Sequence, residues 1–417
     1  MNRRIVFIDM NPANEQIPIY QLGICFLGGI AIEKGWDMDI IEYHALQKCG
    51  VEYFTEILDN AGCIAISIRN IDNTEGRSPI SYLEIMKREV ECLAARYSEK
   101  IVLGGAGFSI LPYEILDLFD VKYGIVGRGG ENFSRMLDWL DAGKKFETFF
   151  QKKIVRCESN CDIYQYEKLE YIWKVIPYIE DDRKSLGFDT HIGCYGHCIY
   201  CTYPSITQKQ RGRRDIHEIC NFISTAEKRG VQRLQIVDDI FNSDLAYAKY
   251  ICDGISKVPH NIKISCYLSP NVDEELVHLL KKAGIMEVVM GIDSLSNTVL
   301  KKMGKNFTEK EIFTARKMLK KEKISVVYTL IVGSIFETLD TLTKTRMNML
   351  KHMPNKITMQ YGIRVYPGTR LYYDLRMDGR ELEFWKPQFA VSDTISKEII
   401  MQFITEMTGL IGERKML

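Results

Sequence analysis

The sequence lacks the features that would place the protein in a membrane or on nucleic acid. It carries no net charge, because 55 Lys and Arg residues balance 55 Asp and Glu residues. A chain without a global basic field is not expected to bind nucleic acid or an anionic membrane. No apolar run approaches the length of a transmembrane helix, and the first residues resemble a strand rather than a signal peptide. We therefore expect a cytoplasmic protein.

Disulfide bonds are also not expected. The chain has 12 cysteines among 417 residues, and without a secretory signal these thiols should stay reduced. Cys220, Cys252 and Cys266 fall on apolar faces and are expected to pack in the core. Cys157 and Cys161 form a C-x3-C pair without a third partner nearby, so chance placement in a linker is favoured over an auxiliary cluster.

The first 145 residues alternate short apolar strands with helical patterns, which predicts an open, doubly wound α/β sheet. A G-x-G-x-x-G motif is missing after the first strand, which argues against a dinucleotide site. The predicted strands are Arg4–Asp9, Asp37–Tyr43, Cys63–Arg69, Lys100–Leu103 and Tyr123–Val126, and the predicted helices are Tyr20–Lys34, Glu52–Asn60, Ser81–Tyr97 and Glu131–Ala142.

Three loops follow the carboxyl ends of these strands, where ligands of such sheets bind. They are Ser67–Asn73, Gly104–Ser109 and Gly127–Glu131. Glycines at strand ends allow backbone to approach a ligand closely and to offer its amides. Glycine turns occur in any fold of this kind, so the loops mark a candidate edge without identifying its ligand.

Three cysteines in one short loop are the most informative feature of the chain. Cys194, Cys198 and Cys201 are spaced C-x3-C-x2-C, with Tyr200 before the last cysteine. Three thiolates on one loop can hold three irons of a 4Fe–4S cluster and leave the fourth iron open for a ligand. A structural zinc site needs four protein ligands, so zinc would require His191 or His197 as the fourth.

A second α/β series surrounds this loop. Its helices are amphipathic, as in the stretches Asp273–Ala283 and Thr308–Lys321. The predicted strands are Gly187–Gly193, Arg233–Val237, Lys263–Tyr267, Glu287–Gly291, Ser325–Val332 and Lys356–Val365.

The cysteine loop resembles the signature of the radical S-adenosylmethionine (SAM) enzymes. The resemblance implies a partial (β/α)6 barrel in which the open iron chelates SAM and one electron cleaves SAM to a 5′-deoxyadenosyl radical. Tyr200 would shield the cluster or pack beside SAM, although ordinary packing is an equal alternative. The segments at the ends of the second, fourth, fifth and sixth strands resemble family motifs, with these candidate cofactor-binding residues: Asp238, Asp239, Asp293, Ser294, Gly333, Glu337 and Arg364.

Each of these acids could instead have a purely structural role, in which it pairs with an arginine or caps the next helix. The basic run Arg211–Arg214 follows the cysteine loop. Such runs usually form a solvated face, but this one could receive a phosphate or a carboxylate.

Residues 1–145 resemble the cobalamin-binding domain that precedes many radical SAM modules. The loops that carry the resemblance supply these candidate cofactor-binding residues: Arg69, Asn70, Asp72, Gly104, Gly105, Gly107, Gly127 and Glu131. The D-x-H-x-x-G motif, which supplies a histidine ligand to cobalt, is absent, and His44 lies in the wrong place. The resemblance therefore implies an open lower face, with Arg69 the candidate beneath the corrin; the alternative is that Arg69 and Asp72 only cap and pair at a strand end.

These resemblances predict four segments: a Rossmann-like domain (1–145), a linker (146–184), a radical SAM barrel (185–375) and a C-terminal cap (376–417) that contributes to the substrate pocket. The implied function is a cobalamin-dependent radical SAM methyltransferase that passes the methyl group of methylcobalamin, regenerated from SAM, to a carbon of a small molecule or peptide. The expected partner is an electron donor such as flavodoxin or ferredoxin, and the chain is expected to be a monomer.

Three alternatives stay open. Both cofactors could serve a rearrangement, cyclisation or oxidation without methyl transfer. A methylthiotransferase would need a second cluster, for which Cys25, Cys63 and Cys92 offer only a superficial match. A sensor that never cleaves SAM is the last alternative.

Overall fold

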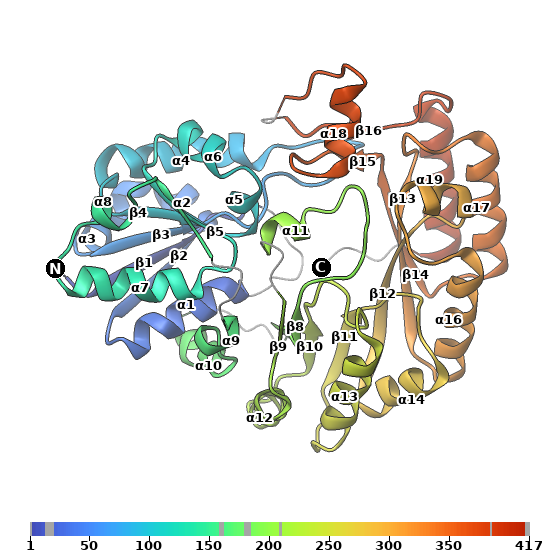
Figure 1. Cartoon of the computed structure of the whole chain (residues 1–417), viewed down its shortest axis with the longest axis horizontal. Coiled ribbons are helices and arrows are strands. Elements are labelled where there is room, and N and C mark those ends of the chain that lie inside the picture. The colour runs from blue at the N-terminus through green and yellow to red at the C-terminus, as the bar shows by residue number, and fades with distance from the viewer. Residues whose placement is uncertain are drawn as a thin grey trace.

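The protein consists of two α/β units that lie side by side (Figure 1). The computed structural model describes residues 2–12, 21–157, 162–178, 185–207, 211–383 and 386–412. The N-terminal unit is blue to cyan in Figure 1, and the C-terminal unit runs from green to red. None of the helices in these ranges is both long and apolar enough to cross a membrane.

The first unit is built on a parallel six-stranded sheet in the order β2-β1-β3-β4-β5-β6. All five predicted strands are found within two residues of their expected ends, and Arg4–Asp9 and Tyr123–Val126 match fully. The strands are β1 (Arg4–Asp9), β2 (Asp37–Glu42), β3 (Cys63–Ser67), β4 (Ile101–Gly104), β5 (Tyr123–Val126) and β6 (Ile154–Arg156).

Both faces of this sheet are buried, as a doubly wound sheet requires. Successive side chains of a strand point to opposite faces. Accordingly, Ile5 and Phe7 of β1 belong to one hydrophobic cluster, whereas Val6 and Ile8 belong to another. The helices that cover the two faces are α1 (Leu22–Glu33), α2 (Tyr43–Cys49), α3 (Thr55–Asp59) after the 3-10 turn η1 (Val51–Phe54), α4 (Tyr82–Tyr97), α5 (Ala106–Ile110), α6 (Pro112–Phe119) and α7 (Gly130–Asp141).

The segment predicted as a linker contributes to the first unit. Strand β6 pairs with β5, and a Cβ atom at Gly29 of α1 would lie 2.2 Å from the Tyr171 side chain. Cys157 is buried, whereas Cys161 lies outside the described residues. The other elements of this segment are α8 (Phe146–Phe149), α9 (Ile163–Tyr166), α10 (Glu170–Val175) and η2 (Ile176–Tyr178).

The second unit is a parallel six-stranded sheet whose strands follow chain order, β14-β13-β12-β11-β10-β7. Its edge strands β7 and β14 do not pair with each other within the described ranges, so the barrel stays partial, as the sequence predicted. The strands are β7 (Ser185–Phe188), β10 (Arg233–Ile236), β11 (Lys263–Tyr267), β12 (Ile285–Asp293), β13 (Ser325–Val332) and β14 (Lys356–Tyr361), with the short pairs β8 (His191–Ile192) with β9 (Gly212–Arg213) and β15 (Ile363–Arg364) with β16 (Phe389–Ala390).

The C-terminal helix completes the outer layer of this barrel. It packs against β14, and the Ile357 amide donates to the Gly412 carbonyl oxygen at 3.2 Å. Phe384 and Trp385, expected in the cap, lie outside the described residues. The helices are α11 (Tyr203–Ile206), α12 (Ile216–Lys228), α13 (Leu245–Ser256), α14 (Glu274–Lys282), α15 (Asn297–Lys302), α16 (Glu309–Lys321), α17 (Leu339–Lys351), α18 (Arg370–Met377) and α19 (Lys397–Ile411).

Candidate functional site

The three cysteines lie on the loop between β8 and α11, at the mouth of the barrel. All three thiols are half-buried, and a Cβ atom at Gly196 would lie 3.2 Å from the Cys194 sulfur and 4.0 Å from the Cys198 sulfur. Burial raises the pKa of Cys201 to about 12, so its thiol stays protonated unless a bound cation stabilises the thiolate. The spacing and shared loop of the three thiols, rather than this pKa, are what suit them to bind a metal cluster.

The donor set fits an iron–sulfur cluster better than zinc. In the described part of the chain, no three His, Cys, Asp or Glu residues lie close enough to hold one ion. Ligands on different irons of a cluster are spaced more widely than ligands of one ion. His191 is buried and bonded to Asp238 and Ser243, and His197 is exposed, so neither histidine is placed as a fourth zinc ligand.

Neighbouring elements hold the cysteine loop in place. The Ile199 amide donates to the Met303 carbonyl oxygen at 3.1 Å, and the Ile199 carbonyl oxygen accepts from the Leu371 amide at 2.9 Å. Gly304 has a φ of +77°, and a Cβ atom there would lie 2.4 Å from the His197 carbonyl oxygen. The turn between α15 and α16 therefore supports the loop from beneath.

The end of β12 brings Tyr200, Asp293 and Lys305 together. Lys305 Nζ lies 2.7 Å from Asp293 Oδ2 and donates to the Gly291 carbonyl oxygen at 2.8 Å. The Tyr200 hydroxyl donates to the same Asp293 oxygen. Asp293 has a φ of +61° at an irregularity in the β12–β13 pairing. These contacts fix the carboxylate of Asp293 against the cysteine loop.

Charge and burial determine the protonation of Lys305 and Tyr200 beside Asp293. Burial opposes the charge of Lys305, but the Asp293 carboxylate raises the pKa of Lys305 above its usual value. Burial, together with Asp293, raises the pKa of Tyr200 well above its usual value, so its hydroxyl keeps its proton. Lys305 was not predicted, because a single lysine after a short helix carries no sequence signal.

The two acids that follow β10 have different roles. Asp238 is buried, and its oxygens accept from the Thr190 amide at 2.6 Å, the Thr190 hydroxyl at 2.5 Å and the His191 amide at 3.2 Å. It therefore shapes the turn that leads into the cysteine loop. Asp239 Oδ2 is buried, and the described residues offer it no hydrogen-bond partner.

Asp239 is consequently the acid available to a ligand. Burial, followed by the charge of Asp238, raises the pKa of Asp239 to about 6. Asp239 also influences the pKa values of Cys194, Cys201 and Tyr203, which places it near the cysteine loop. A cationic group bound beside Asp239 would lower this pKa and favour the ionised form.

The predicted residues after β12 and β13 are buried. The Ser294 hydroxyl lies 3.2 Å from the Thr345 hydroxyl and accepts from the Ser296 amide at 3.1 Å, so it serves the fold. Gly333 has a φ of +68°, and a Cβ atom there would lie 2.5 Å from the Ile400 side chain. The Gly333 amide donates to Glu337 Oε2 at 2.5 Å, while Glu337 Oε1 is buried with no partner in the described part of the chain.

Glu337→Gln is expected to remove a pH dependence of stability. Burial raises the pKa of Glu337 to about 7 from an ordinary value of 4.5, so its stabilising effect is full below about pH 4.5 and is lost as the pH rises through about 7. Glutamine can still accept from the Gly333 amide. The unfolding free energy of the variant should therefore not show the decline of about 1–3 kcal/mol with rising pH that is expected of the wild type. Denaturant unfolding between pH 5 and 8 measures this, with exposed Glu381→Gln as the control. Equal declines in the variant and wild type would contradict it.

The glycine loops of the first unit pack tightly on each other. A Cβ atom at Gly105 would lie 2.5 Å from the Ile68 carbonyl oxygen, and one at Gly107 would lie 3.0 Å from the Arg69 carbonyl oxygen. The Ser109 hydroxyl accepts from the Gly127 amide at 2.9 Å and donates to the Gly105 carbonyl oxygen at 2.8 Å. The Gly127 amide is thus used within the protein, and these glycines permit close backbone packing.

A cavity of about 350 Å³ lies at this edge of the first sheet. Its wall is mostly apolar, from residues such as Phe7, Phe26 and Phe133, and it extends to Ile206 and Val237 of the second unit. Among the predicted cofactor-binding residues, it includes Arg69, Gly104, Gly105 and Gly127. Glu131 and Asn70 are half-buried, and Glu131 Oε2 is buried without a described partner.

Two other predicted residues pair with each other across the seam between the units. Arg364 Nε donates to Asp72 Oδ2 at 2.8 Å, and both side chains are buried. Asp72 Oδ1 also accepts from the Thr74 amide at 2.8 Å. Asp72 and Arg364 therefore join the N-terminal unit to the barrel, which is the pairing alternative weighed for Asp72.

The basic run after the cysteine loop is mixed, because Arg211 and Arg213 are exposed and Arg214 is buried. Arg214 is fully buried among carboxylates, and Arg213 pairs with Asp244. Arg211 donates to the Cys194 carbonyl oxygen at 2.9 Å. Arg211 and Arg213 thus have the exposed placement expected of such a run, whereas Arg214 is buried and paired with acids; reception of a phosphate or a carboxylate stays a prediction.

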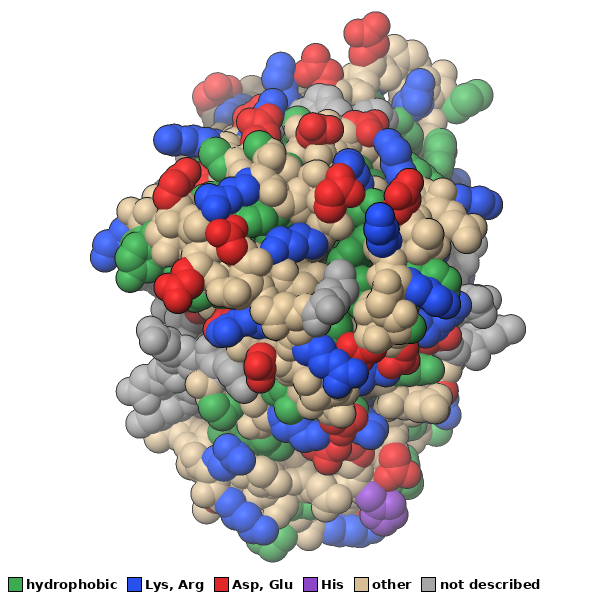
Figure 2. All heavy atoms as spheres, turned by 90° about the vertical axis from the view of Figure 1, so that its left-hand side faces the viewer, with side chains coloured by type: hydrophobic (Ala, Val, Ile, Leu, Met, Phe, Trp, Pro, Cys, Tyr) green, Lys and Arg blue, Asp and Glu red, His purple; other side chains and the backbone are tan. Residues whose placement is uncertain are grey.

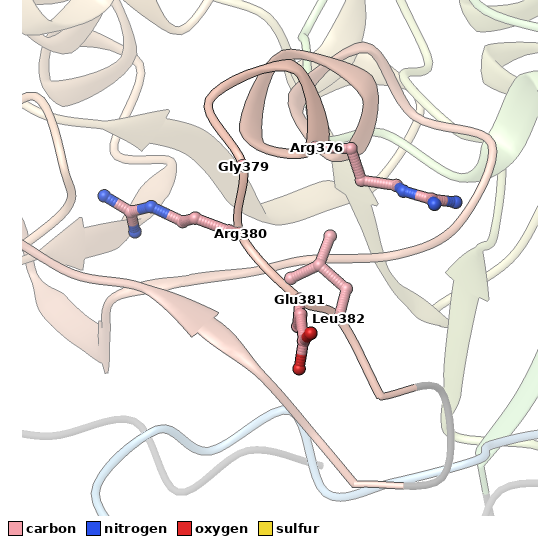
Figure 3. Close-up of a pocket in the computed structure, with 5 residues that line it drawn as sticks. All are labelled: Arg376, Gly379, Arg380, Glu381 and Leu382. Atoms are coloured by element: carbon pink, nitrogen blue, oxygen red, sulfur yellow. The ribbon is translucent and has the colours of Figure 1, made fainter.

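The face of the N-terminal unit in Figure 2 has no concentration of one charge. Figure 2 shows acidic and basic side chains intermixed over the face of the N-terminal unit. A hollow beside Arg376 and Arg380, after α18, is drawn in Figure 3, where the two side chains point away from each other. Arg376 donates to the Tyr372 hydroxyl at 3.1 Å, so its guanidinium bonds within α18.

Comparison with known proteins supports the assignment of the cysteine loop to a radical SAM domain. Residues 190–347 match the model of the Radical SAM superfamily. A putative methylthiotransferase of Methanocaldococcus jannaschii is 23% identical over 333 residues, which span 77% of this chain and 70% of that protein.

Two solved structures share the fold over nearly the whole chain. One is the radical SAM methyltransferase TsrM from Kitasatospora setae with its tryptophan substrate and a SAM analogue, with a TM-score of 0.76, 17% identity, and coverage of 90% of this chain and 76% of that chain. The other is the cobalamin-dependent SAM radical enzyme OxsB with aqua-cobalamin and SAM, with a TM-score of 0.74, 14% identity, and coverage of 98% and 66%. Residues 190–347 therefore match the Radical SAM superfamily, and the chain has the fold of these two solved structures.

Proposed function

We propose that the protein is a cobalamin-dependent radical SAM methyltransferase that methylates a carbon of a small molecule or peptide. The observation that carries the proposal is a single seam with a candidate site on each side. The cysteine loop and Asp239 lie at the barrel mouth, and the cavity beside Arg69 lies at the facing edge of the first sheet. When bound, a cluster would supply the electron that cleaves SAM, and cobalamin would carry the methyl group.

The cavity suits part of a cobalamin molecule. Its apolar wall and volume of about 350 Å³ match a flat aromatic base better than a whole corrin ring, since ligand pockets are commonly 300–1,000 Å³. Among the described residues, no histidine lines it. Arg69 borders the cavity and influences the pKa of Tyr203 in the barrel, so we keep Arg69 as the candidate beneath the corrin.

The barrel residues have separable tasks in this proposal. Cys194, Cys198 and Cys201 would ligate the cluster, and Asp239 would accept a hydrogen bond from an ammonium group of SAM or of the substrate. Asp293, oriented by Lys305 and Tyr200, would accept from ribose hydroxyls. Glu337 would keep a proton near neutral pH and order the backbone after β13.

The exposed aromatic side chains at the mouth support an organic substrate. Tyr203 and Tyr267 are 45% and 38% exposed, and Val237 is 36% exposed. Apolar side chains that remain exposed beside a site commonly contact a ligand. We further infer a cytoplasmic monomer that receives electrons from a flavodoxin or ferredoxin.

The methylthiotransferase alternative has less support. Cys25 and Cys63 lie within the hydrophobic core, and burial raises their pKa values. Cys92 is exposed on α4. The three residues therefore do not have the shared, accessible surroundings that a second cluster requires.

The products of SAM test the proposed reaction. Reconstituted protein is incubated anaerobically with cobalamin, a reductant and SAM labelled in its methyl group, together with candidate amines and peptides. Methyl transfer gives S-adenosylhomocysteine and labelled product. Formation of 5′-deoxyadenosine alone, with no labelled product, would instead support a rearrangement, cyclisation or oxidation with the same cofactors.

A further inference from the structure

Five charged side chains form a largely buried network between the two units, in which only Arg128 and Glu218 are partly exposed, at 23% and 26%. They come from three parts of the chain: Arg128 from the first unit, Glu167 from the connecting segment, and Asp189, Arg214 and Glu218 from the barrel unit. Buried charges are retained only when they are paired and hydrogen-bonded. The network is therefore a specific junction rather than a surface ion pair.

Arg128 is the member that reaches across the junction. Its Nε donates to Glu167 Oε2 at 2.7 Å, and one terminal nitrogen lies 2.9 Å from Asp189 Oδ2. The side chains of Glu167 and Asp189 are 5% and 3% exposed. These carboxylates raise the pKa of Arg128 despite its burial, so the arginine stays charged and its orientation is fixed.

Arg214 anchors the other end of the network. Its guanidinium donates to Asp189 Oδ1 at 2.7 and 3.0 Å and to Glu218 Oε1 at 3.1 Å. It also donates to the Glu167 carbonyl oxygen at 2.7 Å. Asp189 therefore bonds both arginines and links the two ends of the network.

The network touches both candidate sites. Arg128 and Glu167 line the cavity of the first unit. Asp189 directly precedes Thr190 and His191, whose amides are held by Asp238 at the start of the cysteine loop. The same charges therefore border the cavity and the support of the cysteine loop.

We propose that Arg128 is a positioning residue that sets the placement of the N-terminal cavity relative to the barrel mouth, through Glu167 and Asp189. The inference rests on the proposed function, because it assumes that a group in the cavity must face the barrel. Methyl transfer requires reacting groups held within a short distance. A fixed seam supplies that placement without Arg128 itself contacting the reacting atoms.

Stability and placement can be separated by substitution. Arg128→Gln leaves the buried Glu167 carboxylate without its cation, which is more disruptive than removing both members of a buried pair. The double variant Arg128→Gln/Glu167→Gln removes that unpaired charge but does not restore the link to Asp189. The control is Arg135→Gln, whose side chain is 57% exposed and 4.0 Å from Glu131.

The test uses the reconstituted full-length protein and hydroxocobalamin as the probe. Arg128→Gln is expected to lower the thermal midpoint and to weaken hydroxocobalamin binding by about tenfold, with iron content and reductive SAM cleavage within about twofold of wild type. The double variant should regain the thermal midpoint but not the hydroxocobalamin affinity. Arg135→Gln should match wild type in every measurement.

Three results would overturn the inference: wild-type hydroxocobalamin affinity in Arg128→Gln, recovery of affinity together with stability in the double variant, or a parallel loss of SAM cleavage. If Arg128→Gln does not fold, the double variant alone decides between these outcomes. Wild-type protein that binds no hydroxocobalamin would refute the proposed function instead. In that case hydrogen exchange of residues 185–192 decides: faster exchange in Arg128→Gln supports the junction, and unchanged exchange refutes it.

Discussion

Cys198→Ala is expected to abolish cluster assembly and, with it, SAM cleavage. A 4Fe–4S cluster on this loop depends on three thiolates, and two remaining cysteines cannot hold three irons. Iron content after anaerobic reconstitution should fall from about four atoms per chain to background. The 5′-deoxyadenosine formed with dithionite should fall to the level of iron-free protein.

A matched control separates this effect from a general loss of a thiol. Cys49 is exposed at the end of α2, so Cys49→Ala should retain full iron content and SAM cleavage. When both variants are compared without iron, their thermal midpoints should lie near that of iron-free wild type, because Cys49 is exposed and Cys198 is only half-buried. A Cys198→Ala protein that held a full cluster would refute the ligand assignment.

Lys305→Met is expected to destabilise the protein and to impair SAM cleavage. The side chains of Lys305 and Asp293 are 8% and 7% exposed, and breaking a buried ion pair by removing one partner costs about 3–5 kcal/mol. The loss of the cation also frees Asp293 and, through it, Tyr200. Denaturant unfolding measures the stability, and 5′-deoxyadenosine formation measures the cleavage.

The design includes a compensating change and a control. Lys305→Met/Asp293→Asn removes both charges, so it should recover most of the stability but little of the SAM cleavage. Lys302→Met alters an exposed lysine on α15 and should leave both measurements unchanged. A loss of less than about 1 kcal/mol in Lys305→Met, the range of a surface pair, would show that the pair is not buried in solution.

The sequence predicted the strands well, because buried parallel strands are short apolar runs with few alternatives. It missed β6, whose three residues Ile154–Arg156 are too few for a periodic pattern. It also missed the short helix α5, which follows from the glycine turn at Gly105 rather than from propensity. These elements depend on contacts made by the folded chain.

The sequence predicted the cysteine loop of the site, but not the partners of its buried acids. The cysteine spacing is local, so the loop could be recognised without a structure. Roles that depend on partners distant in the chain could not: Asp72 pairs with Arg364, and Asp293 pairs with Lys305. Asp238 and Asp239 are adjacent, yet only the structure distinguishes the internally bonded acid from the one without a partner.

The central claim is that one seam holds two cofactors. Anaerobic purification with added cobalamin, followed by iron analysis and the visible spectrum of the folded protein, tests it most directly. The account requires about four irons and a bound corrin on the same chain. A well-folded protein with a full complement of iron and no corrin would contradict it.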